Sequence, residues 1–509
     1  MFKSSTRRQF LQAAAAGGAF AGWGDLGFLG RLPAVAAAEA KLDSKMVQFQ
    51  PEIEPLVRLI EDTPRDKLLE QVAARIHAGA SYAEVLAALL LAGIRNVQPR
   101  PSVGFKFHAV LVVNSAHLAS LASPAEHRWL PIFWALDYFK EAQAQDVREG
   151  DWTMSAPDES ALPTADKAKQ AFEEAMDQWD VAKADAAATA LARTGDRHAL
   201  FNLFSRYGSR DFRSIGHKAI YVSNAWRTLE AIGWQHAEPV LRSLAYAMLQ
   251  HEDGNPASQD LPADRPGREN AKRILKFPEN WKQGQLDERA TTDLLATLRS
   301  GSQEDACNQV VELLQHSVAP QSIWDALFLG AGELLVRQPG IVSLHAVTST
   351  NALHFAYTAS TDEQNRKLLL LQNTAFLPMF RGAMEGRGKL ADFKLTDLEP
   401  GELDASGAMA VERILSDVSS NPMDAARETL TYMAERTDPA PLADAARLLV
   451  FLKGNDAHDY KFSSAVLEDY RQLSPAWRNR YLAASMFHLN GAGERDNELV
   501  QRTRAALGA

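Results

Sequence analysis

The sequence predicts an all-α protein: a multi-helical repeat assembly of about four related units, arranged as an α/α solenoid or a toroid. Two observations support this fold class. Apolar residues recur at helical spacing along almost the whole chain, as in Leu68, Leu69 and Val72, while alternating strand patterns are scarce. The best candidate for a strand, residues 110–113, is continued by residues at helical spacing. A histidine motif also returns at a nearly constant offset, which is typical of internal repeats.

The composition is that of a protein with a substantial core. The chain has 509 residues, of which 46% are hydrophobic and 23% are charged, and its formal net charge is −10. An acidic chain without basic blocks disfavours nucleic acid and anionic membranes as partners. The single cysteine, Cys307, excludes an intramolecular disulfide, a CxxC redox pair, an attached c-type haem and a cysteine-rich zinc site.

The first forty residues are predicted to be an export signal. Residues 6–12, with Arg7 and Arg8, resemble the twin-arginine motif, and an Ala- and Gly-rich stretch follows that is too polar to span a membrane. Small residues then offer cleavage, so that the mature chain begins near Ala37 or Lys41. We therefore expect passage through the twin-arginine translocation machinery, a periplasmic or secreted location, and no stable membrane insertion. A chance pair of arginines in a disordered N-terminus is the alternative explanation.

Three polar stretches rich in Pro, Gly and Asp divide the remainder of the chain. These predicted linkers are residues 143–164, 251–288 and 385–407. The helical units that they delimit, which we expect to form one continuous domain after the signal at residues 1–40, are residues 41–142, 165–250, 289–384 and 408–509.

The units share a short pattern, H-A-V-x3-N-x2-H. It occurs from His108 to His117 and again 237 residues later, from His345 to His354. The second unit carries a weaker copy that begins one place early, at His217, and the fourth unit carries a faint echo with His458 just upstream. Repeated helical units stack because one helical pair cannot bury its own apolar face.

The histidines are the candidate functional residues. On a straight helix nine residues turn through about 900°, so the first and last histidines of one motif lie on opposite faces and cannot bind one ion together. A shared site would need one histidine from each unit, namely His108, His217, His345 and His458. Three or four neutral imidazoles together with carboxylates would suit iron, zinc or copper, and a carboxylate from another unit or a bound water would have to complete the metal shell. The competing interpretation is that each unit buries its histidine and asparagine as hydrogen-bonded packing between helices.

Other signals for chemistry are weak. The sequence contains no HExxH pair, no Walker loop, no G-x-S-x-G, and no glycine-rich dinucleotide motif after a strand. Glu333 is an acid inside an apolar helical segment, which indicates a capped or paired structural group. Lys106 and Lys461 are expected to be exposed charges only.

Three short segments resemble the questin oxidase-like family. These are His345-Ala346-Val347-Thr348-Ser349 followed by Arg366-Lys367-Leu368-Leu369, then Gly216-His217-Lys218-Ala219-Ile220, and finally Asp456-Ala457-His458-Asp459-Tyr460-Lys461. The resemblance implies oxidation of aromatic polyketides of the Baeyer–Villiger type without a recognisable flavin fold, with a metal ion or NADPH as cofactor. Two features depart from the family: the export signal, and Ala-Ile in place of Pro-Leu-Ile after His217.

The sequence thus predicts an exported oxidoreductase that acts on a small, aromatic molecule in a histidine-lined cleft. His108, His217, His345 and His458 are the catalytic or metal-binding candidates. Two alternatives remain: a non-catalytic periplasmic helical binding or scaffold protein, and a metal- or haem-carrying protein without turnover. Convergence of the histidines on one centre would favour the enzyme, and their separation would favour the scaffold.

Overall fold

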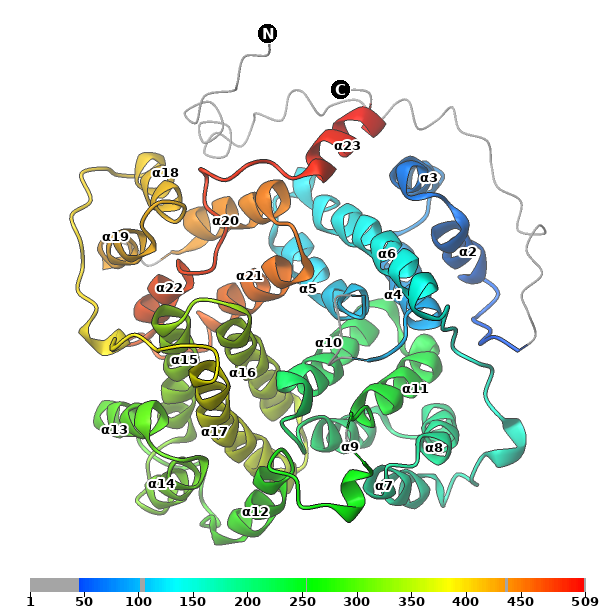
Figure 1. Ribbon diagram of the computed structural model, residues 1–509, viewed down its shortest axis with the longest axis horizontal. Coiled ribbons are helices and arrows are strands. Elements are labelled where there is room, and N and C mark those ends of the chain that lie inside the picture. The colour runs from blue at the N-terminus through cyan, green and yellow to red at the C-terminus, as the bar shows by residue number, and fades with distance from the viewer. Residues whose placement is uncertain (1–44, 101–105, 253, 435–437, 508–509) are drawn as a thin grey trace.

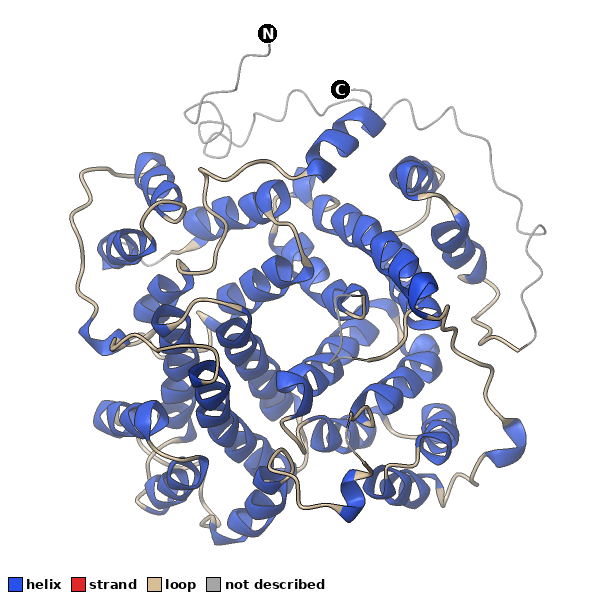
Figure 2. Cartoon of the chain, in the orientation of Figure 1, coloured by secondary structure: helices blue, strands red, loops and turns tan. Residues whose placement is uncertain are grey.

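The computed structural model describes residues 45–100, 106–252, 254–434 and 438–507, so the predicted signal peptide lies outside the described residues. Within them the regular secondary structure is helical, with 22 α-helices and no strand (Figure 2). The predicted all-α class is confirmed. None of the described helices combines the length and the apolar character needed to cross a membrane.

Four helices form a closed ring at the centre of the molecule (Figure 1). They are α5 (His108–Ala122), α10 (His217–Ile232), α16 (Ile341–Ala359) and α21 (Ala457–Asp469). Each packs against two of the others, in the order α5, α10, α16, α21 and back to α5. We call these four helices the inner ring. The segment at residues 110–113, which was the best strand candidate, lies inside α5.

The inner helices run parallel to one another, as hydrogen bonds between equivalent levels of the ring establish. Asn114 donates to Asn224 at 3.3 Å, and these residues lie six and seven places after the first residues of α5 and α10. At the same level the Ser464 hydroxyl donates to the Ser115 carbonyl at 2.8 Å. The N-termini of all four helices therefore meet at one end of the ring.

The remaining helices surround the inner ring and bury it. Each inner helix is covered by at least one of them: α6 packs on α5, α9 and α11 on α10, α15 and α17 on α16, and α20 on α21. Their bounds are α2 (Glu54–Asp62), α3 (Arg65–His77), α4 (Tyr82–Asn96), α6 (Leu130–Glu149), α7 (Ala168–Gln178), α8 (Val181–Thr194), α9 (Arg197–Gly208), α11 (Ala237–Met248), α12 (Arg265–Arg273), α13 (Glu288–Ser300), α14 (Gln303–Gln315), α15 (Pro320–Arg337), α17 (Glu363–Glu385), α18 (Ala408–Asp417), α19 (Pro422–Ala434), α20 (Ala440–Lys453), α22 (Arg478–Ser485) and α23 (Glu498–Leu507).

The sequence of the inner helices explains their central position. In α5 every residue from His108 to Ala116 is buried, and in α16 the same is true from Val342 to His354. A helix that is apolar on all sides has no face for solvent and must be enclosed by other helices. Helices of the outer layer, such as α13, instead bury one stripe and expose the rest.

Two of the predicted boundaries shift. α6 continues to Glu149, into the expected linker at 143–164, and α12 lies inside the expected linker at 251–288. Each predicted unit nevertheless supplies one inner helix. The relationship of the four units as repeats stays a prediction. The expectation for Glu333 is confirmed, because Arg299 binds its carboxylate with two hydrogen bonds of 2.7 and 2.9 Å.

Candidate metal centre

The four predicted histidines meet at the N-terminal end of the inner ring. His108 and His217 are the first residues of α5 and α10, His458 is the second residue of α21, and His345 lies one turn inside α16. The Nε2 atom of His217 lies 2.8 Å from that of His108 and 3.0 Å from that of His345. One ring nitrogen from each of the four lies within 4.8 Å of the other three. We call this group the four-histidine cluster.

Acceptors behind the rings fix the tautomer of three of these histidines. The Nδ1 atom of His217 lies 2.5 Å from the Ser214 carbonyl, and that of His345 lies 2.6 Å from the Ile341 carbonyl. A carbonyl oxygen can only accept, so each Nδ1 carries the hydrogen and each Nε2 presents a lone pair to the cluster.

His458 is held in the same way by an acid. Its Nδ1 lies 3.1 Å from the Asp456 carboxylate, which also accepts from the His458 backbone N–H at 2.6 Å. Asp456 and Asp459 form a capping box that begins α21, so the local helix-start signal of the sequence places this histidine. A histidine whose Nδ1 is held by a carboxylate or a carbonyl is the usual arrangement behind a metal-binding Nε2.

Electrostatics keep the cluster neutral. All four imidazoles are buried, with exposures between 1% and 6%. Burial lowers the pKa of His108, His217 and His345 well below the usual value, and the neighbouring Lys461 lowers each further. Burial also lowers the pKa of His458, although Asp456 partly offsets the effect. The Nε2 lone pairs of His217 and His345 face each other at 3.0 Å, and two facing lone pairs repel each other unless a cation lies between them.

The spacing of the nitrogens suits a metal ion. With bonds of about 2.1 Å, neighbouring donors lie about 3.0 Å apart in a square arrangement and about 3.4 Å apart in a tetrahedral one. The observed 2.8 and 3.0 Å, both between histidines of neighbouring inner helices, match the square edge. Four nitrogen donors in a tetragonal arrangement are typical of Cu²⁺ or Ni²⁺ sites, and imidazole also suits iron and zinc.

A buried lysine accompanies the cluster, and sequence reasoning misplaced it. Lys461 was expected to be an exposed charge; this was wrong, since its side chain is 2% exposed and it lowers the pKa of all four cluster histidines. Its Nζ makes no hydrogen bond with any residue that the structure describes. Burial lowers the pKa of Lys461 to about 7. Its position one turn after His458, on a helix enclosed on all sides, was the signal that could have identified it.

The expectation for Lys106 was wrong for a different reason. Lys106 is also buried, but its Nζ forms ion pairs of 2.8 Å with both Asp146 and Glu149. The two buried lysines therefore differ in a way that the sequence does not reveal. One has two carboxylate partners near the protein surface, and the other faces a neutral cluster.

The axis of the inner ring below the cluster is polar and tightly packed. A cavity with room for about one water molecule lies there. Its lining comes from all four inner helices and consists of Asn114, Ser115, Leu118, Ile220, Asn224, Arg227, Thr348, Asn351, Lys461, Ser464 and Ala465. The motif asparagines serve packing here, since Asn224 donates to the Leu111 carbonyl at 3.0 Å and Asn351 donates to Asp469 at 2.7 Å.

The second histidine of each motif does not join the cluster. His117 lies on the other face of α5, where its Nδ1 is 3.0 Å from the Tyr82 hydroxyl. His354 packs against Trp324 in a T-shaped arrangement, with ring centroids 4.7 Å apart. This separation follows the helical geometry that the sequence predicted.

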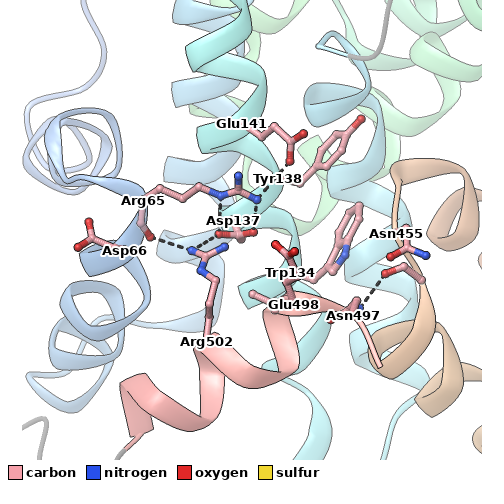
Figure 3. A pocket seen from close by; sticks show the side chains of 12 residues that line it. Arg65, Asp66, Trp134, Asp137, Tyr138, Glu141, Asn455, Asn497, Glu498 and Arg502 are labelled. Atoms are coloured by element: carbon pink, nitrogen blue, oxygen red, sulfur yellow. Dashed lines mark hydrogen bonds and ion pairs between the residues drawn. The ribbon is translucent and has the colours of Figure 1, made fainter. Parts of the chain in front are cut away.

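A surface pocket of about 550 Å³ borders the loop that precedes α21 (Figure 3). Arg65 binds Asp137 at its rim with two hydrogen bonds of 3.0 and 2.7 Å. Trp134 and Tyr138 form one wall, and Trp134 also packs on Tyr460 of α21 at 4.4 Å between centroids. The pocket thus reaches the element that carries His458, through aromatic side chains.

No protein-family model, curated protein or solved structure matches this chain. The geometry of the four-histidine cluster is therefore the basis on which its chemistry is assigned.

Proposed function

We propose that the protein is a metal-dependent oxidoreductase in which His108, His217, His345 and His458 bind one redox-active transition-metal ion, copper or iron. One observation carries this proposal: the Nε2 atoms of His217 and His345 approach to 3.0 Å while the Nδ1 hydrogens of both rings are engaged by backbone carbonyls behind them. A histidine that serves only packing donates or accepts through a complementary partner. Here each Nδ1 hydrogen is bound to a carbonyl acceptor behind its ring, whereas the Nε2 lone pairs of His217 and His345 face each other.

The charge of the site indicates what it would bind besides the metal. All four donors are neutral, and Asp456, which lies behind His458, binds one of them. Because the four donors are neutral, they would not cancel the charge of a bound divalent ion, which would remain largely uncompensated inside the protein. Such a site favours an anionic oxygen as a further ligand, because buried charge must be compensated.

The substrate class follows from the family resemblance. The resemblance to the questin oxidase-like family supports aromatic substrates. Because the cavity below the cluster has room for about one water molecule, such a substrate would bind in the surface pocket walled by Trp134 and Tyr138, and the anionic oxygen at the metal would be hydroxide. A redox-active copper or non-haem iron ion supplies one-electron and O₂ chemistry when bound.

Protein groups have defined tasks in this proposal. The Ser214 and Ile341 carbonyls and the Asp456 carboxylate orient the three imidazoles whose Nδ1 atoms they accept from. Lys461 supplies or accepts a proton beside the cluster, and its pKa of about 7 suits an exchange in either direction near neutral pH. The enclosing helices exclude bulk water from the cluster.

The export signal adds a cellular context to the proposal. The predicted signal resembles that of the twin-arginine route, which exports proteins that are already folded, often with a cofactor in place. A metal held between helices from all four parts of the chain needs a folded protein, which agrees with loading before export. We therefore propose a periplasmic or secreted location.

Elemental analysis of the exported protein tests the function. We expect about one copper or iron ion per chain, and the Cu²⁺-loaded protein should give the electron paramagnetic resonance spectrum of a tetragonal site with four nitrogen donors. Retention of less than about a tenth of an ion per chain after loading with Cu²⁺ or Fe²⁺ and dialysis would contradict the proposal and favour the scaffold. A stoichiometric metal with no turnover of aromatic compounds would favour a metal carrier.

A further inference from the structure

The backbone before His217 adopts an unusual conformation. The short helix η5 (Arg213–Gly216) contains Ser214 at φ 58° and Ile215 at φ 43°, and Gly216 follows at φ 81°. Three successive residues are therefore left-handed. For Ile215, whose β-branched side chain crowds the backbone, this is a rare and strained conformation. Strained backbone persists where surrounding contacts hold it, and it gathers at functional sites.

The strained turn has one clear consequence at the cluster. It directs the Ser214 carbonyl toward the His217 ring, 2.5 Å from Nδ1. His217 is the histidine whose Nε2 contacts both His108 and His345. The turn therefore sets the tautomer of the imidazole on which two of the short nitrogen contacts depend.

Gly216 is required by the closeness of the neighbouring helix. A Cβ atom at this position would collide with the Ser349 hydroxyl of α16, and its positive φ disfavours other residues. The turn thus lies directly against the inner helix that carries His345. This contact explains why a glycine precedes α10. It does not explain what holds Ser214 and Ile215 in their left-handed conformation.

Asp211 bridges the two sides of the turn. Its Oδ1 accepts from the Arg213 backbone N–H at 2.9 Å, before the turn. Its carboxylate also accepts from Lys218 Nζ at 3.2 and 3.1 Å, after the turn. Both side chains are fully enclosed, with exposures of 0% for Asp211 and 1% for Lys218. A buried carboxylate that holds residues on both sides of a strained segment opposes its relaxation.

We propose that Asp211 is a positioning residue for the four-histidine cluster. By binding the Arg213 N–H and the Lys218 ammonium group, it holds the left-handed turn that keeps His217 protonated at Nδ1 with its Nε2 lone pair directed at the centre. Its effect on metal affinity rests on the function proposed above. Its effect on the tautomer of His217 does not, because it is a property of the metal-free chain.

A matched residue distinguishes positioning from ordinary buried pairing. Asp185 of α8 binds the fully buried Arg242 of α11 with hydrogen bonds of 2.7 and 2.9 Å. This pair joins two helices of the outer layer and touches no cluster histidine. Its loss should therefore lower stability without changing His217.

The first test is ¹⁵N nuclear magnetic resonance of the metal-free full chain with labelled histidines, and the His217→Gln variant identifies the His217 signals. We expect Asp211→Ala to move His217 toward protonation at Nε2, because the released ring then donates a hydrogen bond to the His345 Nε2 lone pair. Asp185→Ala should leave the His217 signals unchanged. Unchanged signals in Asp211→Ala, or an equal shift in Asp185→Ala, would overturn the proposal.

The second test is Cu²⁺ affinity. Loss of a group that orients a metal-binding histidine typically weakens binding by about 10- to 100-fold, and we expect this for Asp211→Ala. Asp211→Asn should lose less, because its amide oxygen still accepts from the Arg213 N–H. If Asp211→Ala does not fold, the same two measurements are made on Lys218→Met, which removes the other end of the bridge. In that variant Arg210 and Arg213 remain near the Asp211 carboxylate, so the buried charge keeps positive partners.

The two tests separate this inference from the proposed function. A tautomer shift in Asp211→Ala, in a protein whose wild type takes up no metal, would support the positioning role and contradict only the metal site. The opposite outcome is a wild type that binds stoichiometric metal and an Asp211→Ala variant whose His217 tautomer and Cu²⁺ affinity are unchanged. That outcome would overturn the positioning role and leave the metal site standing.

Discussion

The Nε2 atoms of His217 and His345 lie 3.0 Å apart, and the Nδ1 atom of each ring is bound to a backbone carbonyl, that of Ser214 and that of Ile341. A hydrogen bond between the two Nε2 atoms needs a proton, but each ring has its proton on the other side and burial opposes an extra one. The unloaded cluster is therefore electrostatically unfavourable, and a cation would relieve it.

Replacement of a single cluster histidine should abolish tight metal binding. His217→Gln removes the donor that contacts two others, so we expect Cu²⁺ affinity to fall by about 100-fold or more, beyond the loss caused by an orienting residue. His354→Gln is the control, because His354 packs against Trp324 outside the cluster. Isothermal titration of both variants with Cu²⁺ measures the difference. Equal affinities would place the metal elsewhere.

The metal-free protein should lose stability as the pH falls below about 6.5. The cluster histidines have pKa values lowered in the folded state, so the unfolded chain binds more protons in this range and protonation favours unfolding. Each imidazole contributes up to about 1.4 kcal/mol per pH unit until the pH reaches its folded-state pKa.

Urea unfolding of wild type and His345→Gln at pH 7.5, 6.5 and 5.5 measures this dependence. The variant should show the shallower decline, because it has one fewer buried imidazole. The comparison also removes the opposing effect of Asp459, whose burial raises its pKa to about 6 in both proteins. Parallel pH profiles would contradict the lowered pKa of His345.

Lys461→Met should stabilise the metal-free protein at pH 6. Burial lowers the pKa of Lys461 to about 7, so below pH 7 the folded state must carry a buried ammonium ion for which no described residue supplies a hydrogen bond. The gain should be several kcal/mol at pH 6 and should shrink as the pH rises from 7 toward 10, where the unfolded lysine also loses its proton.

Lys106→Met is the matched control for that measurement. Lys106 is equally buried but pairs with Asp146 and Glu149 at 2.8 Å, so its removal takes the positively charged partner from both carboxylates. We expect a loss of about 1–3 kcal/mol in urea unfolding at the same pH. A loss of stability in Lys461→Met as large as that in Lys106→Met would mean that the Lys461 amine has a stabilising contact.

Export should depend on the paired arginines. Changing Arg7 and Arg8 together to lysine is expected to leave a longer precursor in the cytoplasm, because the twin-arginine machinery recognises the pair. Cell fractionation with mass spectrometry of the mature N-terminus, expected near Ala37 or Lys41, measures the outcome. Unaltered secretion of the variant would remove the argument for loading the metal before export.

Much of the architecture follows from local signals in the sequence. Helical periodicity and uniformly apolar segments predicted the all-α class and the enclosed helices, because both depend on residues a few positions apart. The repeated pattern selected His108 and His345, and its weaker copies added His217 and His458, all of which the structure brings together. Helical geometry also separated His117 and His354 from them correctly.

Tertiary structure alone decided which residue of each inner helix faces the cluster and which charges surround it. His345 enters the cluster from one turn inside its helix, while His217 enters from the first residue of α10, one place before the aligned Lys218. One residue rotates a side chain by about 100°, so alignment alone cannot decide which of the two faces the centre. The left-handed turn before His217 decides it, and that turn lies against Ser349 of α16, more than a hundred residues away in the sequence.

The two buried lysines illustrate the same limit. The sequence predicts Lys106 and Lys461 alike as exposed charges. In the structure Lys106 pairs with two carboxylates, whereas Lys461 lies beside four neutral imidazoles. Helix formation depends on neighbours along the chain, so the sequence by itself determined which segments are helical and which histidines recur. Burial and partnership depend on closure of a ring between segments more than a hundred residues apart, as from His108 to His217, and only the packed structure determines them.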